Sequence, residues 1–408
     1  MHSIESRKSW FIAWTALAAM SVSYGAPQVV VVALRPIADS LGDARSLPAL
    51  AYSLAWLGTG VGGLIMGRIA GRIGVRWTVC FGALMVAAGL IISSGGTVWQ
   101  LVLGHGVFIG LLGNGGLNAP LYVYVSRWFD NRRGTALALI SSGQYVAGMI
   151  WPSIFAHAIV AFGWQHTMHT FAVFEALTVA PVGFFVFREP PEPAVATLAS
   201  TGPRPGEPVL GLRPNLVLLM LGVAGFCCCV PMAMPQGHLV AFCGDLGIRS
   251  TVGAAMLSLL LGSAFVSRQF WGWLSDRIGG LRTIFACSAA QLTAMSGFLL
   301  TQNEVGLFIV AGLFGLGFSG LIPAYVLAVR ELFPAAEANW RVPCVLLFSG
   351  SGMAAGGWLA GWIFDRVGYY TAAFGVGMGF NVANLLIVGL LLMQLRQVRR
   401  PGLAAAAE

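Results

Sequence analysis

Charged residues are scarce in this chain of 408 residues. Asp, Glu, Lys and Arg together make up 9% of the sequence, while hydrophobic residues make up 57%. A soluble protein carries roughly a quarter charged residues, so most of this surface cannot face water. The net charge of +8 could indicate a nucleic-acid partner in another composition, but here the basic residues lie in the loops between apolar runs. We therefore predict an integral membrane protein that contacts the lipid bilayer and binds no nucleic acid.

Sequence patterns for metal and redox chemistry are also missing. The seven cysteines include no Cys-x-x-Cys pair and no histidine at a zinc-binding spacing. Even the run Cys227 to Cys229 lacks a second group of ligands, so we interpret the cysteines as small packing residues. No nucleophile–base pair is found either. We predict no metal, no cofactor and no enzymatic activity.

Long apolar runs, in contrast, fill most of the sequence. A helix needs about 20 mostly apolar residues to cross ~30 Å of hydrocarbon. The runs are too long and continuous for the strands of a membrane barrel, and the first lacks the cleavage pattern of a signal peptide. The sequence predicts an all-α membrane protein with twelve spans, at 10–34, 48–70, 76–95, 99–124, 134–158, 165–187, 214–243, 252–274, 281–301, 304–329, 342–364 and 370–394.

The basic residues are distributed unevenly between the two sets of loops. If the amino terminus is cytoplasmic, 18 of the 23 Lys and Arg residues lie in cytoplasmic segments. The positive-inside rule therefore predicts that both termini are cytoplasmic. Short loops and the lack of a targeting sequence suit a multi-pass protein of the cell inner (plasma) membrane.

A proline-rich polar segment divides the chain into halves that resemble each other. Residues 189–213 are predicted to form an extended cytoplasmic linker between six-helix bundles at 1–188 and 214–408. The run Gly67 to Gly74 recurs as Gly272 to Gly279, and Leu41-Gly42 recurs as Leu246-Gly247 at the same offset. Two such halves predict bundles that enclose a midplane site and rock about it.

The repeated loop carries a family resemblance. Gly272, Asp276, Arg277 and Gly279 resemble the signature loop of the major facilitator superfamily. The run Arg127 to Ala136, with its continuation to Tyr145, looks like the helix 4–5 region of monocarboxylate and oxalate–formate carriers. The superfamily resemblance covers nearly the whole chain and implies two pseudo-symmetric six-helix bundles.

The chain also departs from these families. Gly71 replaces the aspartate that is usual in the first-half loop. Animal monocarboxylate carriers resemble this pattern, but they have a lysine at the position of Gln28 and an aspartate at the position of Ala264. The second cation of oxalate–formate carriers is missing, since no basic residue lies between Arg341 and Arg366. This difference argues against a compact dianion as substrate.

Arg268 lies in the middle of the eighth apolar run. An uncompensated cation at such depth costs at least ~2.5–3.5 kcal/mol, so its side chain should face a polar cavity or a partner. The resemblance implies that it binds a substrate carboxylate, for which a guanidinium offers two-point geometry. The alternatives are an ion pair with Asp276 or a side chain that reaches toward the cytoplasm.

Two titratable side chains are candidates for proton coupling. His238 follows Pro235-Gln236-Gly237, which would loosen the helix and let the imidazole reach the cavity, and its titration range suits proton transfer. Glu175 is the clearest acidic residue inside a span. A role as a buried packing group remains an alternative for both, and for Glu175 a neutral carboxyl bonded to a neighbouring helix is preferred.

Further polar residues complete the predicted sites. Polar side chains on helices that commonly line the superfamily's cavity are predicted to orient the substrate by hydrogen bonds, although each could instead bond to a neighbouring helix. They are Gln28, Asn118, Tyr122, Gln144, Gln236 and, more weakly, Ser349. The loop motifs predict gating roles for Gly67, Arg72, Arg132, Arg133, Gly272, Asp276 and Arg277.

The sequence thus predicts a secondary active transporter. We expect it to move a small organic anion, a monocarboxylate, by alternating access as a functional monomer, with protons as the coupled ion. Anion exchange is an alternative. A non-transporting membrane sensor is another, although neither terminus is long enough for a signalling domain, and a hydrophobic-drug exporter is a third.

Overall fold

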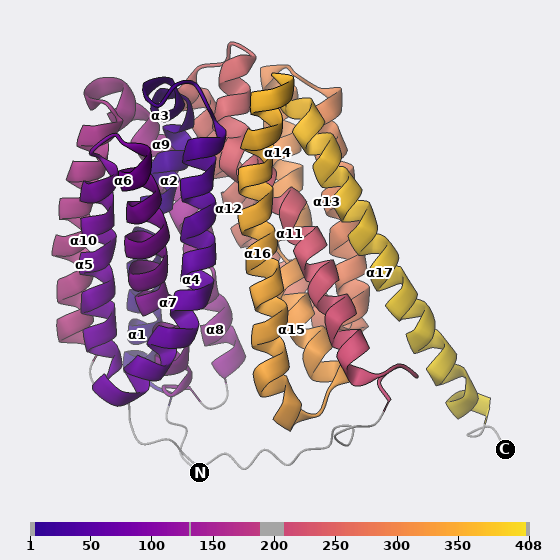
Figure 1. Ribbon diagram of the computed structural model, residues 1–408. Coiled ribbons are helices and arrows are strands. Elements are labelled where there is room, and N and C mark those ends of the chain that lie inside the picture. The colour runs from indigo at the N-terminus through magenta and orange to yellow at the C-terminus, as the bar shows by residue number, and fades with distance from the viewer. Residues whose placement is uncertain (1–4, 130–131, 188–207, 405–408) are drawn as a thin grey trace. The chain divides into compact units, whose positions relative to one another are not determined.

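The computed structural model describes residues 5–129, 132–187 and 208–404, and nearly all of them are helical. The first half of the chain contains α1 (Arg7–Ser23), α2 (Gly25–Val32), α3 (Leu34–Ser40), α4 (Ser46–Ile73), α5 (Val75–Ser93), α6 (Val98–Leu103), the π-helix η1 (Gly104–Asn114), α7 (Gly115–Ser126), α8 (Arg133–Ser141), α9 (Gly143–Phe162) and α10 (Trp164–Val186). The second half contains α11 (Pro214–Asp245), α12 (Ser250–Ile278), α13 (Gly280–Leu300), α14 (Glu304–Phe318), α15 (Leu321–Leu332), α16 (Ala335–Val367) and α17 (Tyr370–Ala404) (Figure 1).

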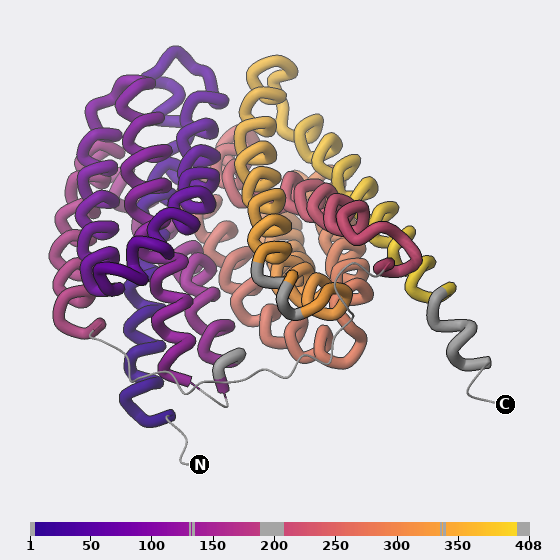
Figure 2. The backbone as a smooth tube through the Cα atoms, turned by 60° about the horizontal axis from the view of Figure 1, so that its bottom comes forward, coloured from indigo at the N-terminus to yellow at the C-terminus, as the bar shows by residue number. Residues whose placement is uncertain are grey.

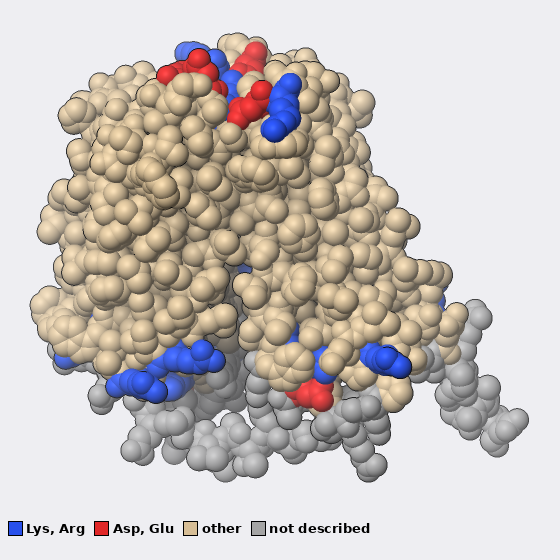
Figure 3. All heavy atoms as spheres, in the orientation of Figure 1, with Lys and Arg blue, Asp and Glu red and all other residues tan. Residues whose placement is uncertain are grey.

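The predicted all-α membrane fold is confirmed. Twelve helical segments are long and apolar enough to span a membrane, and each agrees with its predicted range to within four residues at either end. Some spans consist of consecutive helices; the first joins α1 to α2 at Tyr24. On the face drawn in Figure 3, charged side chains gather at the two ends, and the surface between them carries almost none. That belt matches the hydrocarbon layer of a bilayer.

The repeat seen in the sequence has a counterpart in the backbone. Gly74 follows α4 with φ of +89°, and Gly279 follows α12 with φ of +85°. Only glycine adopts such angles without steric cost, so both chain reversals depend on this residue. Two further pairs of positive-φ glycines keep the same spacing along the chain: Gly42 with Gly247, and Gly163 with Gly368.

The helices group into two compact units. The first unit combines the described part of Met1–Val195 with Gln236–Gly262 and Gly357–Tyr370. The second combines the described part of Ala196–Pro235 with Ser263–Gly356 and Thr371–Glu408. One end each of α11, α12 and α16 therefore belongs to the first unit. The predicted halves 1–188 and 214–408 stay a prediction, and most of the linker 189–213 lies outside the described residues.

Close helix packing shapes the first unit. α10 lies along α5, and α4 lies beside η1 (Figures 1 and 2). A Cβ atom on Gly110 of η1 would lie 2.7 Å from the carbonyl oxygen of Ala55, and one on Gly62 would overlap Leu111. Small residues thus let the two backbones approach closely. π-helical segments are rare and often occur at functional sites, and η1 ends at Asn114.

A buried chain of hydrogen bonds fixes helices of the second unit. Tyr325 donates to Asn384 Oδ1 across 2.6 Å, Asn384 Nδ2 donates to Ser288 Oγ, and Ser288 Oγ donates to Asn381 Oδ1. These contacts join α15, α17 and α13. Each such bond between membrane helices is worth roughly 0.6 kcal/mol on average.

Candidate functional site

The first unit contains a small cavity with polar and aromatic walls. About 20 Å³ of it is open to the centres of water-sized molecules, which is enough for one water molecule and little more. Its lining comes from the junction of α1 and α2 and from α2, α4, η1, α9, α11 and α12: Tyr24, Pro27, Gln28, Tyr52, Ala55, Trp56, Thr59, Asn114, Gln144, Tyr145, Gln236 and Leu261. No Asp, Glu, Lys, Arg or His is among these residues.

Two amides of the lining lack partners. Asn114 is 1% exposed, and neither its Nδ2 nor its Oδ1 has a hydrogen-bond partner among the described residues. Gln28 is 8% exposed, and its Oε1 has no partner in the same part of the chain. Since buried polar groups are nearly always hydrogen-bonded, the cavity presents a donor and acceptors to whatever occupies it.

Aromatic rings form one wall of this cavity. The ring centres of Tyr24 and Trp56 lie 6.1 Å apart at 31°, and those of Tyr52 and Trp56 lie 6.4 Å apart at 81°. Offset and edge-on pairs at such distances are favourable. The pair of Tyr24 and Trp56 holds the junction of α1 and α2 against α4.

The structure brings together three of the residues predicted to bind substrate. Gln28, Gln144 and Gln236 all line the cavity. Asn118 and Tyr122, on α7, do not line it, although the Oδ1 of Asn118 is buried without a partner among the described residues. A role for these five in binding stays a prediction.

Arg268 and Ser349 belong to the second unit. Arg268 lies within the span Ser250–Ile278 on α12 and is 9% exposed. Ser349 on α16 is 3% exposed, and its Oγ has no hydrogen-bond partner in the described segments. Their predicted roles therefore rest on sequence position and burial.

The predicted gating residues lie in the last two turns of α4 and α12 and at the start of α8. Arg72, Asp276 and Arg277 are exposed, and the Arg277 guanidinium lies 4.0 Å from the centre of the Trp273 ring. Gly67 is half-buried near Ala119, and no atom lies within 4 Å of a Cβ added to Gly272. The backbone N–H of Arg132 donates to the Glu5 carboxylate. The side chain of Arg133 lies outside the described residues.

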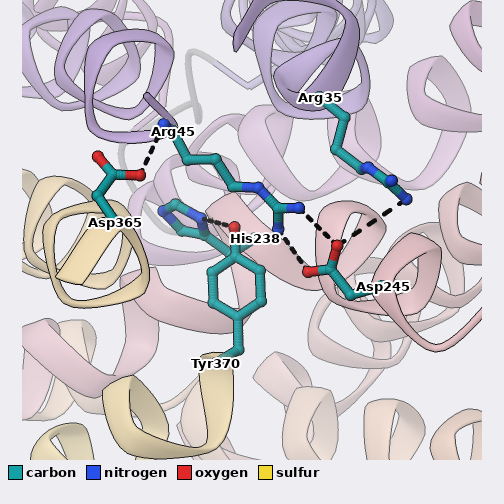
Figure 4. Close-up of polar contacts among 6 residues, drawn as sticks. All are labelled: Arg35, Arg45, His238, Asp245, Asp365 and Tyr370. Carbon is teal, nitrogen blue, oxygen red and sulfur yellow. Dashed lines mark hydrogen bonds and ion pairs between the residues drawn. The ribbon is translucent and has the colours of Figure 1, made fainter. Parts of the chain in front are cut away.

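A cluster of charged and polar side chains joins α3 and the start of α4 to α11, α16 and the start of α17 within the first unit (Figure 4). We call it the Arg45 cluster; it comprises Arg35, Arg45, His238, Asp245, Asp365 and Tyr370. Both terminal NH groups of Arg45 donate to the two carboxylate oxygens of Asp245. Its guanidinium also lies 3.7 Å from the ring centre of Phe364. Such two-point ion pairs are strong and directional.

Burial and pairing act in opposite directions on Arg45. Burial lowers the pKa of its guanidinium, but hydrogen bonds and charge interactions with Asp245 and Tyr370 together outweigh this effect and raise the pKa above the usual range for arginine. The group therefore stays charged at physiological pH. Arg35 approaches the same carboxylate at 3.9 Å, with 44% of its side chain exposed, and forms a much weaker pair.

Asp365 caps the start of α4. Its Oδ1 accepts from the Arg45 N–H at 2.8 Å, and its Oδ2 accepts from the Ser46 N–H at 2.9 Å. These are backbone donors that the first turn of a helix leaves free, and a carboxylate also complements the helix dipole there. The contact needs close approach, since a Cβ on Gly361 would lie 2.9 Å from the Arg45 carbonyl oxygen.

His238 lies inside this cluster and does not line the cavity. It is 1% exposed, and its Nε2 lies 2.7 Å from the Gly357 carbonyl oxygen. A carbonyl can only accept, so Nε2 carries the hydrogen, and Tyr370 then donates its hydroxyl hydrogen to Nδ1 across 3.0 Å. The neutral imidazole is thus fully bonded within a continuous α11, which Pro235 and Gly237 do not interrupt.

Glu175 lies between helices of the first unit. It is fully buried on α10, and Ser23 of α1 donates its hydroxyl to Oε1. Its Oε2 has no partner in the described part of the chain. This geometry fits the preferred interpretation of a carboxyl that bonds to a neighbouring helix, and the proton-relay alternative stays a prediction.

A second cavity of about 380 Å³ lies near the Arg45 cluster, with Arg35 on its wall. Its remaining lining is apolar except for Ser250, and it comes from α2, α3, α9, α10, α11, the following loop and the start of α12. One charged side chain against largely apolar walls distinguishes it from the uncharged cavity at Asn114.

Sequence reasoning missed the Arg45 cluster and Asn114. Arg45 was counted only as one of the few cations on its side of the membrane, a scarcity that could have drawn attention to it. Asp245 and Asp365 each lie just beyond a predicted span. This position is typical of a charged residue in a loop, but it does not indicate which residue the charge pairs with. Asn114 is the last residue of the π-helix η1, and no pattern in the sequence predicts a π-helix there.

Comparison with known proteins identifies relatives. Residues 10–339 match the sequence profile of the Major Facilitator Superfamily. The chain is 25% identical over 313 residues to the MFS transporter asaE of Aspergillus flavus, covering 75% of this chain and 68% of that protein. It is 24% identical over 340 residues to monocarboxylate transporter 13 of Rattus norvegicus, covering 79% of this chain and 74% of that one.

A solved structure shares the fold. The peptide transporter POT in complex with sulfate superimposes with a TM-score of 0.73 at 15% sequence identity, covering 96% of this chain and 95% of that one. At this identity the likeness concerns the arrangement of helices alone.

Proposed function

The chain belongs to the major facilitator superfamily, and we propose that it is a secondary active transporter of a small monocarboxylate, driven by a proton gradient. One observation carries the proposal: Arg268 places a guanidinium in the middle of a membrane span with only 9% of the residue exposed. The similarity to monocarboxylate transporter 13 supports the same substrate class.

The position of Arg268 suits anion binding. A buried cation is retained within a span at a cost of at least ~2.5–3.5 kcal/mol, which a functional role can explain. A carboxylate accepts two parallel hydrogen bonds from a guanidinium. Binding would also neutralise the cation, so that the loaded site could change its exposure from one side of the membrane to the other at lower cost.

Proton coupling follows from the same balance of charge. A proton that travels with the anion makes the transported pair neutral, and either His238 or the substrate's own carboxyl can carry it. We propose a functional monomer with both termini in the cytoplasm of a cell whose inner membrane it spans. The alternative is exchange of one organic anion for another, which leaves charge balanced without a proton.

The proposal is tested with purified protein in liposomes. A panel of labelled monocarboxylates is offered with and without an inward proton gradient, and we expect the gradient to stimulate uptake of at least one of them. Uptake only into vesicles preloaded with an anion would make the protein an exchanger. Binding without any flux would indicate a sensor, and neither binding nor flux of any carboxylate would remove the proposal.

A single substitution distinguishes the two candidate proton carriers, which are His238 and the substrate's own carboxyl. Glutamine at position 238 can still donate to the Gly357 carbonyl and accept from Tyr370, so His238→Gln removes the titration while keeping both contacts. We expect uptake at zero gradient to persist while stimulation by the proton gradient is lost. The measurement is initial uptake rate against external pH.

His157→Gln is the matched control, because His157 is exposed and its Nδ1 bonds to the Ser153 carbonyl of the same helix. It should leave the pH profile unchanged. If His238→Gln keeps the wild-type profile too, the substrate's carboxyl carries the proton and His238 is a packing group.

A further inference from the structure

The second cavity, of about 380 Å³, lies at the ends of membrane spans. Its lining comes from residues at or near the ends of the spans Arg7–Val32, Thr135–Phe162 and Pro214–Asp245 and the starts of the spans Trp164–Val186 and Ser250–Ile278. All of these lining residues belong to the first compact unit. The cavity therefore lies where the hydrocarbon layer of a bilayer meets the lipid headgroups.

One side of this cavity opens toward the lipid. Val160 lies on its wall at the end of a span, and 71% of this residue is exposed. Phe162, two residues further along α9, is 70% exposed. Exposed apolar side chains of this kind mark contact with the membrane. Trp164, which is 5% exposed, also lines the cavity and begins the next span, a position typical of interfacial tryptophan. The lipid-facing surface thus gives an acyl chain direct access to the cavity.

Arg35 carries a positive charge on the wall of this cavity. It lies on α3, three residues beyond the last residue of the first span, and 44% of its side chain is exposed. A Cβ on Gly244 would overlap the guanidinium, so glycine leaves the room that Arg35 occupies. The Asp245 carboxylate is 3.9 Å away, and Arg45 already binds it at two points (Figure 4). Arg35 can therefore bind a further anion.

A cation next to apolar walls favours an anionic amphiphile. A phosphodiester offers a guanidinium two acceptor oxygens. A zwitterionic head would bring its own cation close to Arg35 and Arg45. The carboxylates of the Arg45 cluster are already engaged, Asp245 by Arg45 and Asp365 by two backbone N–H groups. A head with a net negative charge therefore fits better. The volume lies in the range of ligand pockets, roughly 300–1,000 Å³, and suits a phosphate with the adjoining part of one chain.

We propose that this cavity binds the negatively charged head of a membrane phospholipid. Arg35 binds its phosphate, and one acyl chain follows the apolar walls past Val160 into the bilayer. Ser250 contributes a hydroxyl to the same lining. The site goes beyond the proposed transport function and depends neither on Arg268 nor on a carboxylate substrate.

Competition between lipids with the same acyl chains tests the charge. The purified protein in detergent is mixed with equal amounts of dioleoylphosphatidylglycerol and dioleoylphosphatidylcholine, and native mass spectrometry counts which lipid is retained first. We expect phosphatidylglycerol to be retained at least about fivefold more often, which is the gain that one arginine near an anionic head provides. Equal retention of the two lipids would overturn the inference.

Removing the charge tests the residue. In Arg35→Gln the preference should fall to about twofold or less, while Arg35→Lys should keep most of it. Arg249→Gln is the matched control, because Arg249 is an exposed cation between the lining residues Ile248 and Ser250 but does not line the cavity itself. It should bind as the wild type does. An equal loss in the two glutamine variants would mean that the cationic surface attracts anionic lipid in general, and it would overturn the site.

Fluorescence of Trp164 locates the bound chain. Phosphatidylglycerol that is brominated on its acyl chains quenches the tryptophans it contacts, and the quenching that is lost in Trp164→Phe reports on this cavity. We expect that part of the quenching in liposomes of the wild type and expect it to be much smaller in Arg35→Gln. If the wild type and Trp164→Phe are quenched equally, the lipid lies elsewhere and the inference is wrong.

Competing ligands identify the source of the anion. Glycerol phosphate has the anionic head without chains, and oleate has a chain with a carboxylate head. Neither should displace brominated phosphatidylglycerol from Trp164 at equal concentration. Displacement by glycerol phosphate would assign the site to a soluble phosphate, and displacement by oleate to a free fatty acid; either result would overturn the phospholipid assignment. None of these measurements depends on transport, so the proposed function stands or fails separately.

Discussion

Replacing Arg268 with alanine is expected to lower the uptake of carboxylates by about 30-fold or more. Truncating one member of a buried, hydrogen-bonded charge pair costs about 2–5 kcal/mol, and each 1.4 kcal/mol is about a factor of ten in affinity. Since only 9% of Arg268 is exposed, little solvent screening reduces this effect. The loss should appear mainly in the apparent affinity for the anion.

The measurement compares initial uptake rates across substrate concentrations in liposomes that contain equal amounts of folded protein. Elution as a single species and an unchanged melting temperature show that the variant is folded. Arg282→Ala is the matched control, because it removes an exposed cation at the start of α13 without entering a span's interior. It should transport as the wild type does.

Arg268→Lys refines the interpretation. Lysine keeps the positive charge but not the planar fork that binds carboxylate at two points, so we expect partial recovery relative to alanine. If alanine supports uptake at the wild-type rate, the guanidinium does not bind the substrate and a hydrophobic substrate class becomes the better hypothesis. If lysine recovers everything, charge alone is enough.

The spans and the family could be predicted because their signals are local. Each run from 48–70 to 370–394 carries its own hydropathy, and a bilayer leaves a helix as the simplest way to satisfy its backbone. The repeat of Gly74 at Gly279 also required no knowledge of neighbours. The resemblance to the major facilitator superfamily rested on a few residues of the signature loop. It is confirmed by the match of residues 10–339 to the superfamily's sequence profile.

The site could be predicted only in part, because it depends on which helix faces lie together. Gln28, Gln144 and Gln236 are polar residues on helices that the family resemblance predicts to line the cavity, and they do share one cavity. Asn118 and Asn114 are four residues apart on consecutive helical segments, and only Asn114 lines the cavity. The two side chains are separated by about one helical turn along the axis, and the sequence does not reveal at which height the cavity lies.

Ion pairs and hydrogen bonds between residues that are far apart in the sequence could not be predicted either. Arg45 and Asp245 are 200 residues apart, and Arg45 and Asp365 are 320 apart. His238 was expected to reach a cavity through a loosened helix, whereas α11 continues through this region and the imidazole bonds to Gly357 and Tyr370. Partner choice of this kind is decided by tertiary packing.

Replacing Arg45 with alanine is expected to weaken the closure of the first unit by about 3–5 kcal/mol, because it leaves the Asp245 carboxylate partly buried and without its main partner. Alternating access would require this end of the unit to open in every cycle. The open state should then be populated at least about 100-fold, and up to several thousand-fold, more than in the wild type. A membrane-impermeant thiol reagent, applied to the side that carries Arg45, should label Thr59→Cys in the cavity faster by a similar factor. Labelling of the protein without this cysteine provides the background.

Arg35→Ala is the matched control, because Arg35 contacts the same carboxylate from 3.9 Å with 44% of its side chain exposed. An exposed pair of this kind contributes about 0.2–1 kcal/mol, so labelling should rise by no more than about fivefold. The double variant Arg45→Ala/Asp245→Ala should label more slowly than Arg45→Ala, since it leaves no unpaired charge behind. Equal labelling of the Arg45 and Arg35 variants would mean that packing at Gly361, and not the ion pair, holds this end closed. A double variant that labels as fast as Arg45→Ala would mean that the stacking of Arg45 on Phe364 matters more than its charge.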